Sequence, residues 1–210
     1  MYTPPEYTAN DKEEIINFIK TYSFATIITT KDNLPKATHL PFVVMQENDE
    51  IMLISHFAKA NDQWEEITDN QVLVVFAEPH AYISPTHYES PINVPTWNYM
   101  AVHTYGKGEI LVGKQPAIDV LEMMIDKYEP EYKAQWNTLP DNYRDKLITE
   151  IVAFKITVTD IKATKKISQN KRKIEKQNII NSLQKSQHTN EKTIAEMMQK
   201  ELLTKKKNPQ

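Results

Sequence analysis

The residues best suited to chemistry are gathered in one stretch, from His80 to Tyr105, which reads HAYISPTHYESPINVPTWNYMAVHTY. It combines aromatic rings, which give flat apolar walls, with imidazoles, whose ordinary pKa of about 6.5 suits proton exchange near neutral pH. Pockets for flat conjugated ligands are built from such walls and a few placed polar groups. The same aromatic residues could instead be ordinary strand residues, with the prolines stiffening a loop. Periodicity alone leaves both interpretations open.

Several other kinds of site find no support in the sequence. With only three glycines, Gly106, Gly108 and Gly113, the chain holds neither a Walker loop nor a GxGxxG dinucleotide motif. It has no cysteine, which excludes disulfides, thiolate metal sites and a cysteine nucleophile. The six histidines are scattered rather than paired at the spacing of a zinc site, and no GxSxG motif occurs. We therefore assign no catalytic residue and no metal ligand.

Charge divides the chain into an acidic body and a basic tail. Residues 1–160 hold 12 Lys and Arg against 24 Asp and Glu, whereas residues 161–210 hold 13 against 4. A charge run of this kind is commonly a solvated helical face. Clustered Lys and Arg also attract phosphate, so the tail could instead contact DNA or dock on the acidic body.

The elements that must position these residues are mostly strands. Asn10 begins a short amphipathic helix as its N-cap, and the β-branched runs FATIITT and ATHLPFVV then predict a hairpin around the turn at residues 31–33. Further strands are predicted at 51–55, 72–77, 81–84, 97–112 and 151–160, and short helices at about 62–67, 116–128 and 141–148. Most connections are too short for the crossover helices of a parallel sheet. The predicted class is therefore an antiparallel barrel or sandwich.

Beyond Asp160 the strand pattern gives way to apolar residues at helical spacing. Two amphipathic helices are predicted, one over 165–186 and a second beginning at Asn190, with their apolar stripes packed on the body or on a partner. Their predicted stripes comprise Ile167, Ile174, Ile179, Ile180, Leu183, Ile194, Met197, Met198, Leu202 and Leu203. This divides the chain into a body, 1–164, and a basic helical tail, 165–210.

The first ten residues carry neither the basic nor the apolar region of a signal peptide. The apolar runs are also far shorter than the ~20 residues of a spanning helix. We expect a cytoplasmic protein with no membrane partner.

The aromatic run resembles the signature of the PaiB family of FMN-binding negative transcriptional regulators. The matching stretches are PHAYIS, VPTWNY, AVH and YG, beginning at Pro79, Val94, Ala101 and Tyr105 respectively. Three more stretches agree: THLP from Thr38, HFAKAN with Gln63-Trp64 after it, and KISQN from Lys166. The resemblance covers roughly residues 1–185. In this chain Asp62 stands where the family commonly has proline, and it could serve as a helix N-cap.

The resemblance implies a mainly β fold with helices: a split β-barrel of Greek-key antiparallel strands followed by C-terminal helices. It also implies a homodimer with FMN in clefts between the chains. Thr38 and His39 would line the cleft, and Lys59 and Asn61 would meet the phosphate, for which ammonium and amide donors are suited. The remaining residues that the resemblance places at the cofactor are His56, Trp97, His103, Gln169 and Asn170. From the residues alone, Lys59 could equally be a solvated loop lysine, and His39 and His56 structural histidines.

Three functions follow from these observations. The first is repression of transcription by an FMN-binding homodimer, with DNA contacted through the basic tail; no helix-turn-helix is evident, so this contact would be electrostatic. The second is a flavin-dependent oxidoreductase or a haem-handling enzyme on the same barrel, because fold alone does not determine function. The third is a binding module that carries neither cofactor nor DNA.

Overall fold

The computed structural model describes residues 1–207, and side chains as far as residue 203. The chain divides into two compact units. One, the barrel unit, comprises residues 12–76 and 103–161. The other, the helical unit, comprises residues 1–11, 77–102 and the chain from residue 162 onward. The long strands β7 (Thr96–Ile110) and β8 (Ile151–Lys166) run through both units. A boundary at residue 164 stays a prediction.

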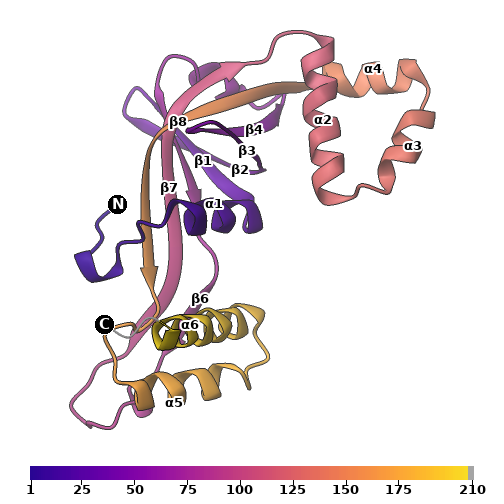
Figure 1. Ribbon diagram of the computed structural model, residues 1–210. Helices are drawn as coiled ribbons and strands as arrows, with labels where there is room; N and C mark the ends of the chain where they lie inside the picture. The colour runs from indigo at the N-terminus through magenta and orange to yellow at the C-terminus, as the bar shows by residue number, and fades with distance from the viewer. Residues whose placement is uncertain (208–210) are drawn as a thin grey trace. The chain divides into compact units, whose positions relative to one another are not determined.

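The strands of the barrel unit form an antiparallel sheet (Figure 1). Beside β7 and β8 they are β1 (Phe24–Lys31), β2 (Leu34–Pro41), β3 (Val43–Glu47), β4 (Glu50–Ala58) and β5 (Gln71–Phe76). Their order is β2-β1-β5-β7-β8-β4-β3, so that β4 pairs with β8 across about a hundred residues of sequence. Among the described strands the path from β2 to β3 does not close. This open, mainly antiparallel sheet confirms the predicted fold class and matches a split barrel.

The turn between β1 and β2 confirms the hairpin predicted from local residues. Asp32 and Asn33 both have a positive φ, 52° and 61°, which is the backbone of the tight turns that suit the twist of paired strands. The predicted second strand, by contrast, is wrong in extent. It breaks at Phe42, whose side chain is fully buried, and the chain continues as β3 to pair with β4 instead of β1.

The barrel unit has an aromatic core flanked by helices. Phe42, Phe57, Phe76 and Phe154 are all fully buried, and the rings of Phe57 and Phe154 stack with centroids 4.7 Å apart. Helix α1 (Lys12–Thr21) buries the apolar stripe predicted for it. Helices α2 (Lys114–Tyr128), α3 (Tyr132–Thr138) and α4 (Asp141–Thr149) follow β7, and α2 and α4 pack on β4 and β8 through an apolar cluster. Helix α3 was not predicted, because Trp136 is its only buried side chain and seven residues give little periodicity.

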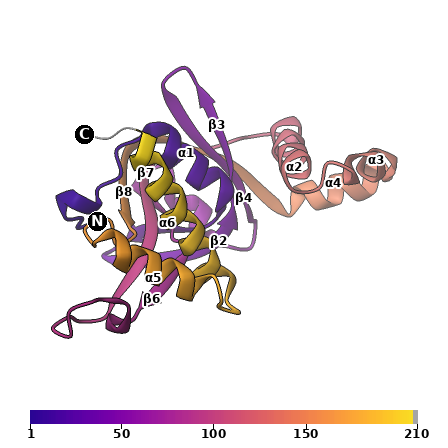
Figure 2. The same cartoon turned by 60° about the horizontal axis from the view of Figure 1, so that its bottom comes forward.

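The helical unit is built on β6 (His80–Ile83), which pairs with β7. Helices α5 (Lys173–Leu183) and α6 (Thr189–Lys207) lie side by side against it (Figures 1 and 2). Their shared core is buried and apolar: Ala81, Ile83, Tyr88, Ile167, Ile179, Ile180, Leu183, Ile194, Ala195 and Met198. The amphipathic tail helices are thereby confirmed, and most residues of the predicted stripes pack on their own chain, whereas Leu203 is about half exposed. Within residues 1–207 no helix is both long and apolar enough to cross a membrane.

The first tail helix begins later than the sequence indicates. Strand β8 continues to Lys166, and the chain then turns at Ser168, whose φ is 58°, before α5 starts at Lys173. As a result Ile174, which the predicted stripe included, is half exposed. Two single-turn 3-10 helices, η1 (Pro5–Tyr7) and η3 (Pro85–His87), were also not predicted.

The start of α5 is stabilised by Glu175, whose carboxylate accepts hydrogen bonds from the backbone N–H groups of Arg172 (3.1 Å) and Glu89 (3.2 Å). It also pairs with the Arg172 guanidinium at 3.0 Å. The guanidinium, followed by these N–H groups, lowers the pKa of Glu175 from 4.5 to about 2.

A carboxyl group whose pKa is lower in the folded chain than in the unfolded chain stabilises the fold at pH values above the unfolded pKa. This stabilisation is lost as the pH falls and the carboxylate is protonated. We expect the free energy of unfolding to fall as pH drops from about 4.5 toward about 2, and Glu175→Gln to reduce this dependence. Urea unfolding at stepped pH measures it, with Glu196→Gln on the exposed face of α6 as the control. An identical pH dependence in wild type and Glu175→Gln would contradict the expectation.

Candidate functional site

A buried glutamine connects the segment after β4 to the β1–β2 hairpin through hydrogen bonds. Gln63 lies in the short 3-10 helix η2 (Asp62–Glu66) and is fully buried. Its Nε2 donates to Thr29 Oγ1 (3.1 Å) and to the Lys36 carbonyl (3.0 Å), and its Oε1 accepts from Thr38 Oγ1 (2.6 Å). An amide with donors and acceptor all engaged is costly to displace, because each freed group would be buried and unsatisfied. Gln63 therefore holds the segment in one position.

This arrangement brings two predicted site residues into contact. Asn61 Nδ2 donates to Thr38 Oγ1 at 2.9 Å, although 23 residues separate them. Asn61 Oδ1 accepts from the backbone N–H of Gln63 at 3.1 Å and is the N-cap of η2. The expectation that Asp62 could cap this helix is thus wrong: Asp62 is its first residue. Asn61 keeps one amide N–H beyond these bonds, since the group has two donors.

The acids beside this contact are neutralised by one lysine. Lys36 Nζ lies 2.9 Å from Asp62 Oδ1 and 2.8 Å from Glu66 Oε1. Glu66 is buried and also accepts from Thr29 Oγ1. The Lys36 ammonium lowers the pKa of both carboxyls, and Glu66, followed by Asp62, raises the pKa of Lys36. The carboxylates are therefore occupied by Lys36.

Lys59 directly follows β4, and its backbone is hydrogen-bonded whereas its ammonium group is not. Its N–H donates to the Glu150 carbonyl at 2.8 Å, and its own carbonyl accepts from the indole N–H of Trp64 at 3.2 Å. The side chain is exposed, and it makes no ion pair or hydrogen bond with any residue in the described part of the chain. A cation on an anchored backbone, two residues from the Asn61 amide, is a donor set that fits a phosphate.

The predicted histidines of the barrel unit lie apart from the Thr38–Asn61 contact. His39 is exposed and follows Thr38 on β2, so strand alternation turns it to the opposite face, where its ring is 6.3 Å from that of Phe24. His56 is half buried on β4 opposite Ala153. Its Nδ1 is buried without a hydrogen-bond partner among the described residues, and burial lowers its pKa. His103 is half buried on β7.

Three predicted residues belong to the helical unit. Trp97 is about half exposed, and its ring meets those of His80 and Tyr82 across the β6–β7 pair, each at 5.8 Å. Gln169 is occupied by its own turn: its Oε1 accepts from the backbone N–H of Ile167 and its Nε2 donates to the Lys165 carbonyl.

Asn170 is the third of these residues, and its Nδ2 donates to the Tyr7 hydroxyl at 3.1 Å. The nine predicted residues are therefore distributed over both units. Sequence reasoning missed Gln63 and Lys36. Gln63 lies in a stretch that carries the family resemblance, but its role could not be inferred without knowing that its side chain is buried.

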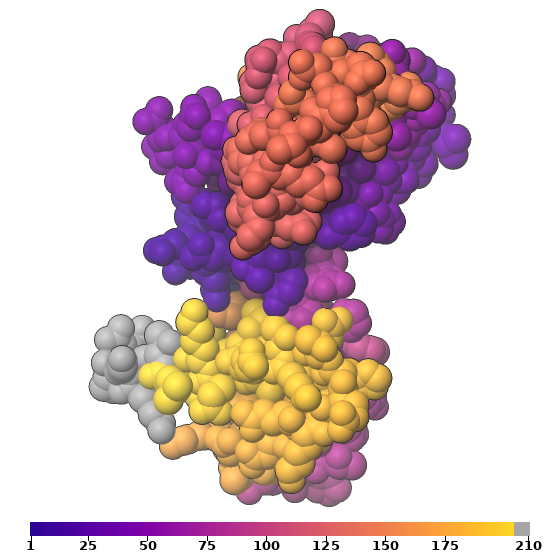
Figure 3. Space-filling view, turned by 90° about the vertical axis from the view of Figure 1, so that its right-hand side faces the viewer, coloured from indigo at the N-terminus to yellow at the C-terminus, as the bar shows by residue number. Residues whose placement is uncertain are grey.

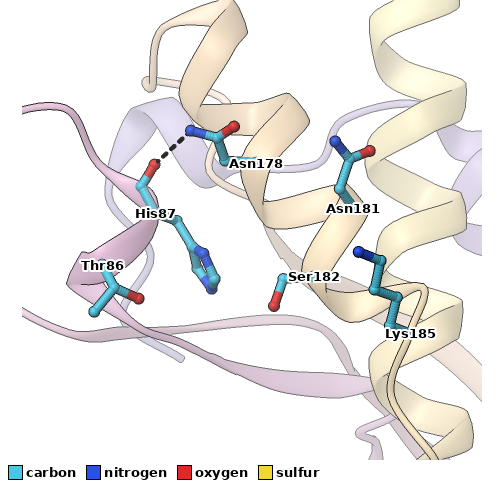
Figure 4. Close-up of a pocket in the computed structure, with 6 residues that line it drawn as sticks. All are labelled: Thr86, His87, Asn178, Asn181, Ser182 and Lys185. Carbon is cyan, nitrogen blue, oxygen red and sulfur yellow. Dashed lines mark hydrogen bonds between the residues drawn. The ribbon is translucent and has the colours of Figure 1, made fainter.

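An open hollow of the helical unit, about 430 Å³, lies between η3 and α5. His87, Ser182 and Lys185 are among its lining residues, and His87 and Ser182 face the same space (Figure 4). Asn178 Nδ2 donates to the His87 carbonyl at 3.2 Å, and burial lowers the pKa of His87. Nothing in this hollow is both buried and unpartnered among the described residues, so it makes a weak candidate site.

Comparison with known proteins identifies the family. The model of the family described as "Putative FMN-binding domain" matches residues 1–160. The chain is 40% identical over 205 residues to "Protease synthase and sporulation protein PAI 2" of Bacillus subtilis, an alignment that covers 96% of this chain and 98% of that protein.

Two solved structures share the fold. The flavocytochrome Anf3 of Azotobacter vinelandii is 12% identical with a TM-score of 0.60, covering 77% of this chain and 70% of that one. The FAD and heme binding protein of Mycobacterium smegmatis is 13% identical with a TM-score of 0.58, covering 76% and 73%. At these identities the likeness concerns the fold alone. The match of the family model over three quarters of the chain, and the alignment over almost all of it, place this chain in the PaiB family of FMN-binding domain proteins.

Proposed function

We propose that this protein is an FMN-binding negative regulator of transcription. The observation that carries the proposal is the alignment over nearly the full length of both chains with a protein named for protease synthesis and sporulation. The family membership supplies the cofactor, FMN. The regulatory part is supported further by the separate basic segment that the chain carries after its acidic body.

We propose that Lys59 and Asn61 bind the FMN phosphate. The free Lys59 ammonium would pair with the phosphate dianion, and the second N–H of the Asn61 amide would donate to a phosphate oxygen. Thr38 has a different role from the one expected of it, because its hydroxyl already donates to Gln63 and accepts from Asn61. It is a positioning residue that orients the Asn61 amide. FMN itself would supply a flat conjugated ring system that can be reduced.

A homodimer is part of the proposal. In the barrel unit Phe24 and Leu34 of the β1–β2 hairpin are 67% and 72% exposed, and in the helical unit Ile92 and Val94 are 89% and 76% exposed. Several large apolar side chains of this kind are typical of a surface covered by a partner. We expect sedimentation equilibrium at micromolar concentration to give twice the chain mass of 24.4 kDa. A monomer throughout this range would contradict the proposal.

The outer face of α5 and α6 is the proposed DNA contact. Their apolar face packs on β6, and Figure 3 shows this part of the chain in orange and yellow. Lys173 and Lys185 are exposed basic residues of this segment. Each neutralised phosphate contributes about −0.9 to the slope of log K against log salt.

We expect DNA binding whose salt slope becomes shallower by about 1.8 in the double variant Lys173→Gln/Lys185→Gln. Lys107→Gln/Lys146→Gln, two exposed lysines of the barrel unit, is the matched control and should keep the wild-type slope. Charge substitution is preferable to deletion of the tail, because deletion would expose the core under α5 and α6. Fluorescence anisotropy with a labelled duplex measures the slope. Absence of binding even at 20 mM salt would exclude the regulatory proposal.

A flavin-dependent oxidoreductase or haem-handling enzyme is the second candidate, supported by His56. Its buried, unpartnered Nδ1 and lowered pKa leave a neutral imidazole that could exchange a proton or ligate iron. The absorption spectrum of the purified protein separates the haem-handling alternative from the flavin-binding candidates, since haem and flavin absorb at different wavelengths. A haem spectrum that is lost in His56→Ala would favour the enzyme.

A further inference from the structure

A second cavity lies wholly within the helical unit, apart from the residues proposed to hold FMN. It has a volume of about 190 Å³ and lies where the N-terminal segment, the loop after η3, the start of β7 and the turn after β8 meet. Its principal polar lining residues are Tyr7, Tyr88, Thr96, Lys166, Asn170 and Lys171. Pockets that enclose a ligand of cofactor size measure about 300–1,000 Å³. This cavity is therefore matched to a smaller molecule.

Two lysine ammonium groups at this cavity have only neutral partners. Lys166 Nζ donates to Thr96 Oγ1 at 2.6 Å and lies 5.5 Å from the centre of the Tyr7 ring. Lys171 Nζ donates to Asn93 Oδ1 at 3.3 Å and lies 4.0 Å from the centre of the Tyr88 ring. Neither pairs with a carboxylate of the described residues, and both side chains are partly buried. The cavity thus holds two positive charges that the fold does not compensate.

Two neighbouring acids are committed elsewhere. Glu89 and Glu175 both pair with Arg172, at 2.6 Å and 3.0 Å, and Glu175 also accepts two backbone N–H bonds. Arg172 is exposed and follows Lys171 directly. These two acids are thereby satisfied by the arginine and do not pair with the two lysines of the cavity.

The Tyr88 hydroxyl is the second, independent sign of a ligand. Tyr88 is only 8% exposed, and its hydroxyl is buried without a hydrogen-bond partner among the described residues. Buried polar groups are nearly always satisfied, so an unpartnered hydroxyl on a residue that lines this cavity indicates an acceptor that enters from outside. An oxygen atom carrying negative charge would satisfy the hydroxyl and both ammonium groups together.

We propose that this cavity binds a small oxyanion, a phosphate or carboxylate group, through Lys166, Lys171 and Tyr88. The cavity has room for about six times the ~30 Å³ share of a water molecule, which suits inorganic phosphate or a short phosphorylated or carboxylated metabolite. Asn170, which the family resemblance places at the cofactor, adds an amide at the rim and holds Tyr7 in place. The N-terminal segment, the loop after η3 and the end of β8 all contribute residues to the site. A bound anion would therefore stabilise the helical unit, which carries the proposed DNA-binding face.

The test is calorimetric titration of the full chain with inorganic phosphate, in Tris chloride at constant ionic strength. We expect saturable binding at one site per chain. Tyr88→Phe should weaken it at least about tenfold, because a hydrogen bond to a charged group is lost. Without phosphate this variant should unfold at no lower temperature than wild type, since the hydroxyl it removes has no partner in the protein. Lys171→Gln should weaken phosphate binding similarly.

Matched controls separate this site from general charge effects and from the FMN proposal. Lys107→Gln, at an exposed lysine of the barrel unit, and Tyr82→Phe, at an exposed tyrosine of β6, should keep wild-type phosphate affinity. Lys59→Ala should weaken FMN but not phosphate, and Tyr88→Phe should do the reverse, so that each proposal can fail alone. Absence of saturable binding would overturn the inference. So would phosphate binding that Tyr88→Phe leaves unchanged, or that is lost in Lys59→Ala and displaced by FMN.

Discussion

Replacing Phe154 with alanine is expected to lower the free energy of unfolding by about 3–5 kcal/mol. The Phe154 side chain on β8 is fully buried. It stacks on Phe57 of β4 with ring centroids 4.7 Å apart and meets the edge of Phe42 at 6.2 Å. Truncation removes these ring contacts and leaves a cavity between strands that cannot collapse without moving the sheet. Denaturant unfolding followed by circular dichroism measures the loss.

The matched control for this substitution is Tyr143→Ala in the same unit. Tyr143 lies on α4 and is 52% exposed, so its truncation should change the free energy of unfolding by about 0.5 kcal/mol or less. Equal losses in the two variants would show that burial in the aromatic core is not what stabilises the sheet. Because Phe57 and Phe154 come from β4 and β8 and Phe42 lies between β2 and β3, we also expect the loss to be accompanied by reduced order across the barrel unit.

Lys59→Ala is expected to weaken FMN binding by about 1.5–3 kcal/mol, the usual worth of a hydrogen bond to a charged group. This corresponds to about 10- to 150-fold in Kd. The structure offers a reason to expect little damage to the fold, since the anchoring bonds of Lys59 to Glu150 and Trp64 use its backbone atoms. Quenching of FMN fluorescence on titration with protein measures the affinity of the wild type and of the variant.

Riboflavin provides the internal comparison for this prediction, because it lacks the phosphate. It should bind the wild-type protein more weakly than FMN does and should be nearly indifferent to Lys59→Ala. Lys31→Ala, an exposed lysine at the end of β1, is the charge control and should leave FMN affinity within about twofold. Equal losses for FMN and riboflavin would mean that Lys59 acts through structure. Unchanged FMN affinity would place the phosphate elsewhere.

The elements that depend on neighbouring residues were largely predictable. The β1–β2 turn follows from Asp32-Asn33, whose side chains tolerate positive φ. Helix α1 and the tail helices follow from their apolar spacing, and the buried Ile179, Ile180 and Ile194 lie in the predicted stripes. The errors occur where local signals are weak or ambiguous. The break at Phe42 directly follows Pro41 inside a run that is otherwise rich in β-forming residues, and α3 is too short to show a period.

In the candidate site, too, some features could be predicted from the sequence and others could not. Thr38, Lys59 and Asn61 were predicted through the family resemblance, and the local sequence did not say what each side chain contacts. The hydrogen bond between Asn61 and Thr38 depends on the position of η2, which Gln63 holds by hydrogen bonds to the β1–β2 hairpin. In the proposed function Thr38 is therefore given the role of positioning the Asn61 amide, and its contact with the cofactor stays a prediction. Asn170 and Gln169 are adjacent in sequence, yet one contacts Tyr7 and the other its own turn.

Most of the local elements, the division into acidic body and basic tail, and the family could be predicted from the residues alone. These depend on periodicity, turn residues, charge counts and motif spacing, all of which can be read along the chain. Which distant groups meet, and which remain without a partner, became known from the folded chain. Tyr88 and Lys171 are 83 residues apart, and whether the hydroxyl is satisfied or the ammonium neutralised depends on how β6, α5 and the turn after β8 pack. Spacing along the chain carries no information about such contacts, because they are formed by packing between segments that are remote in sequence.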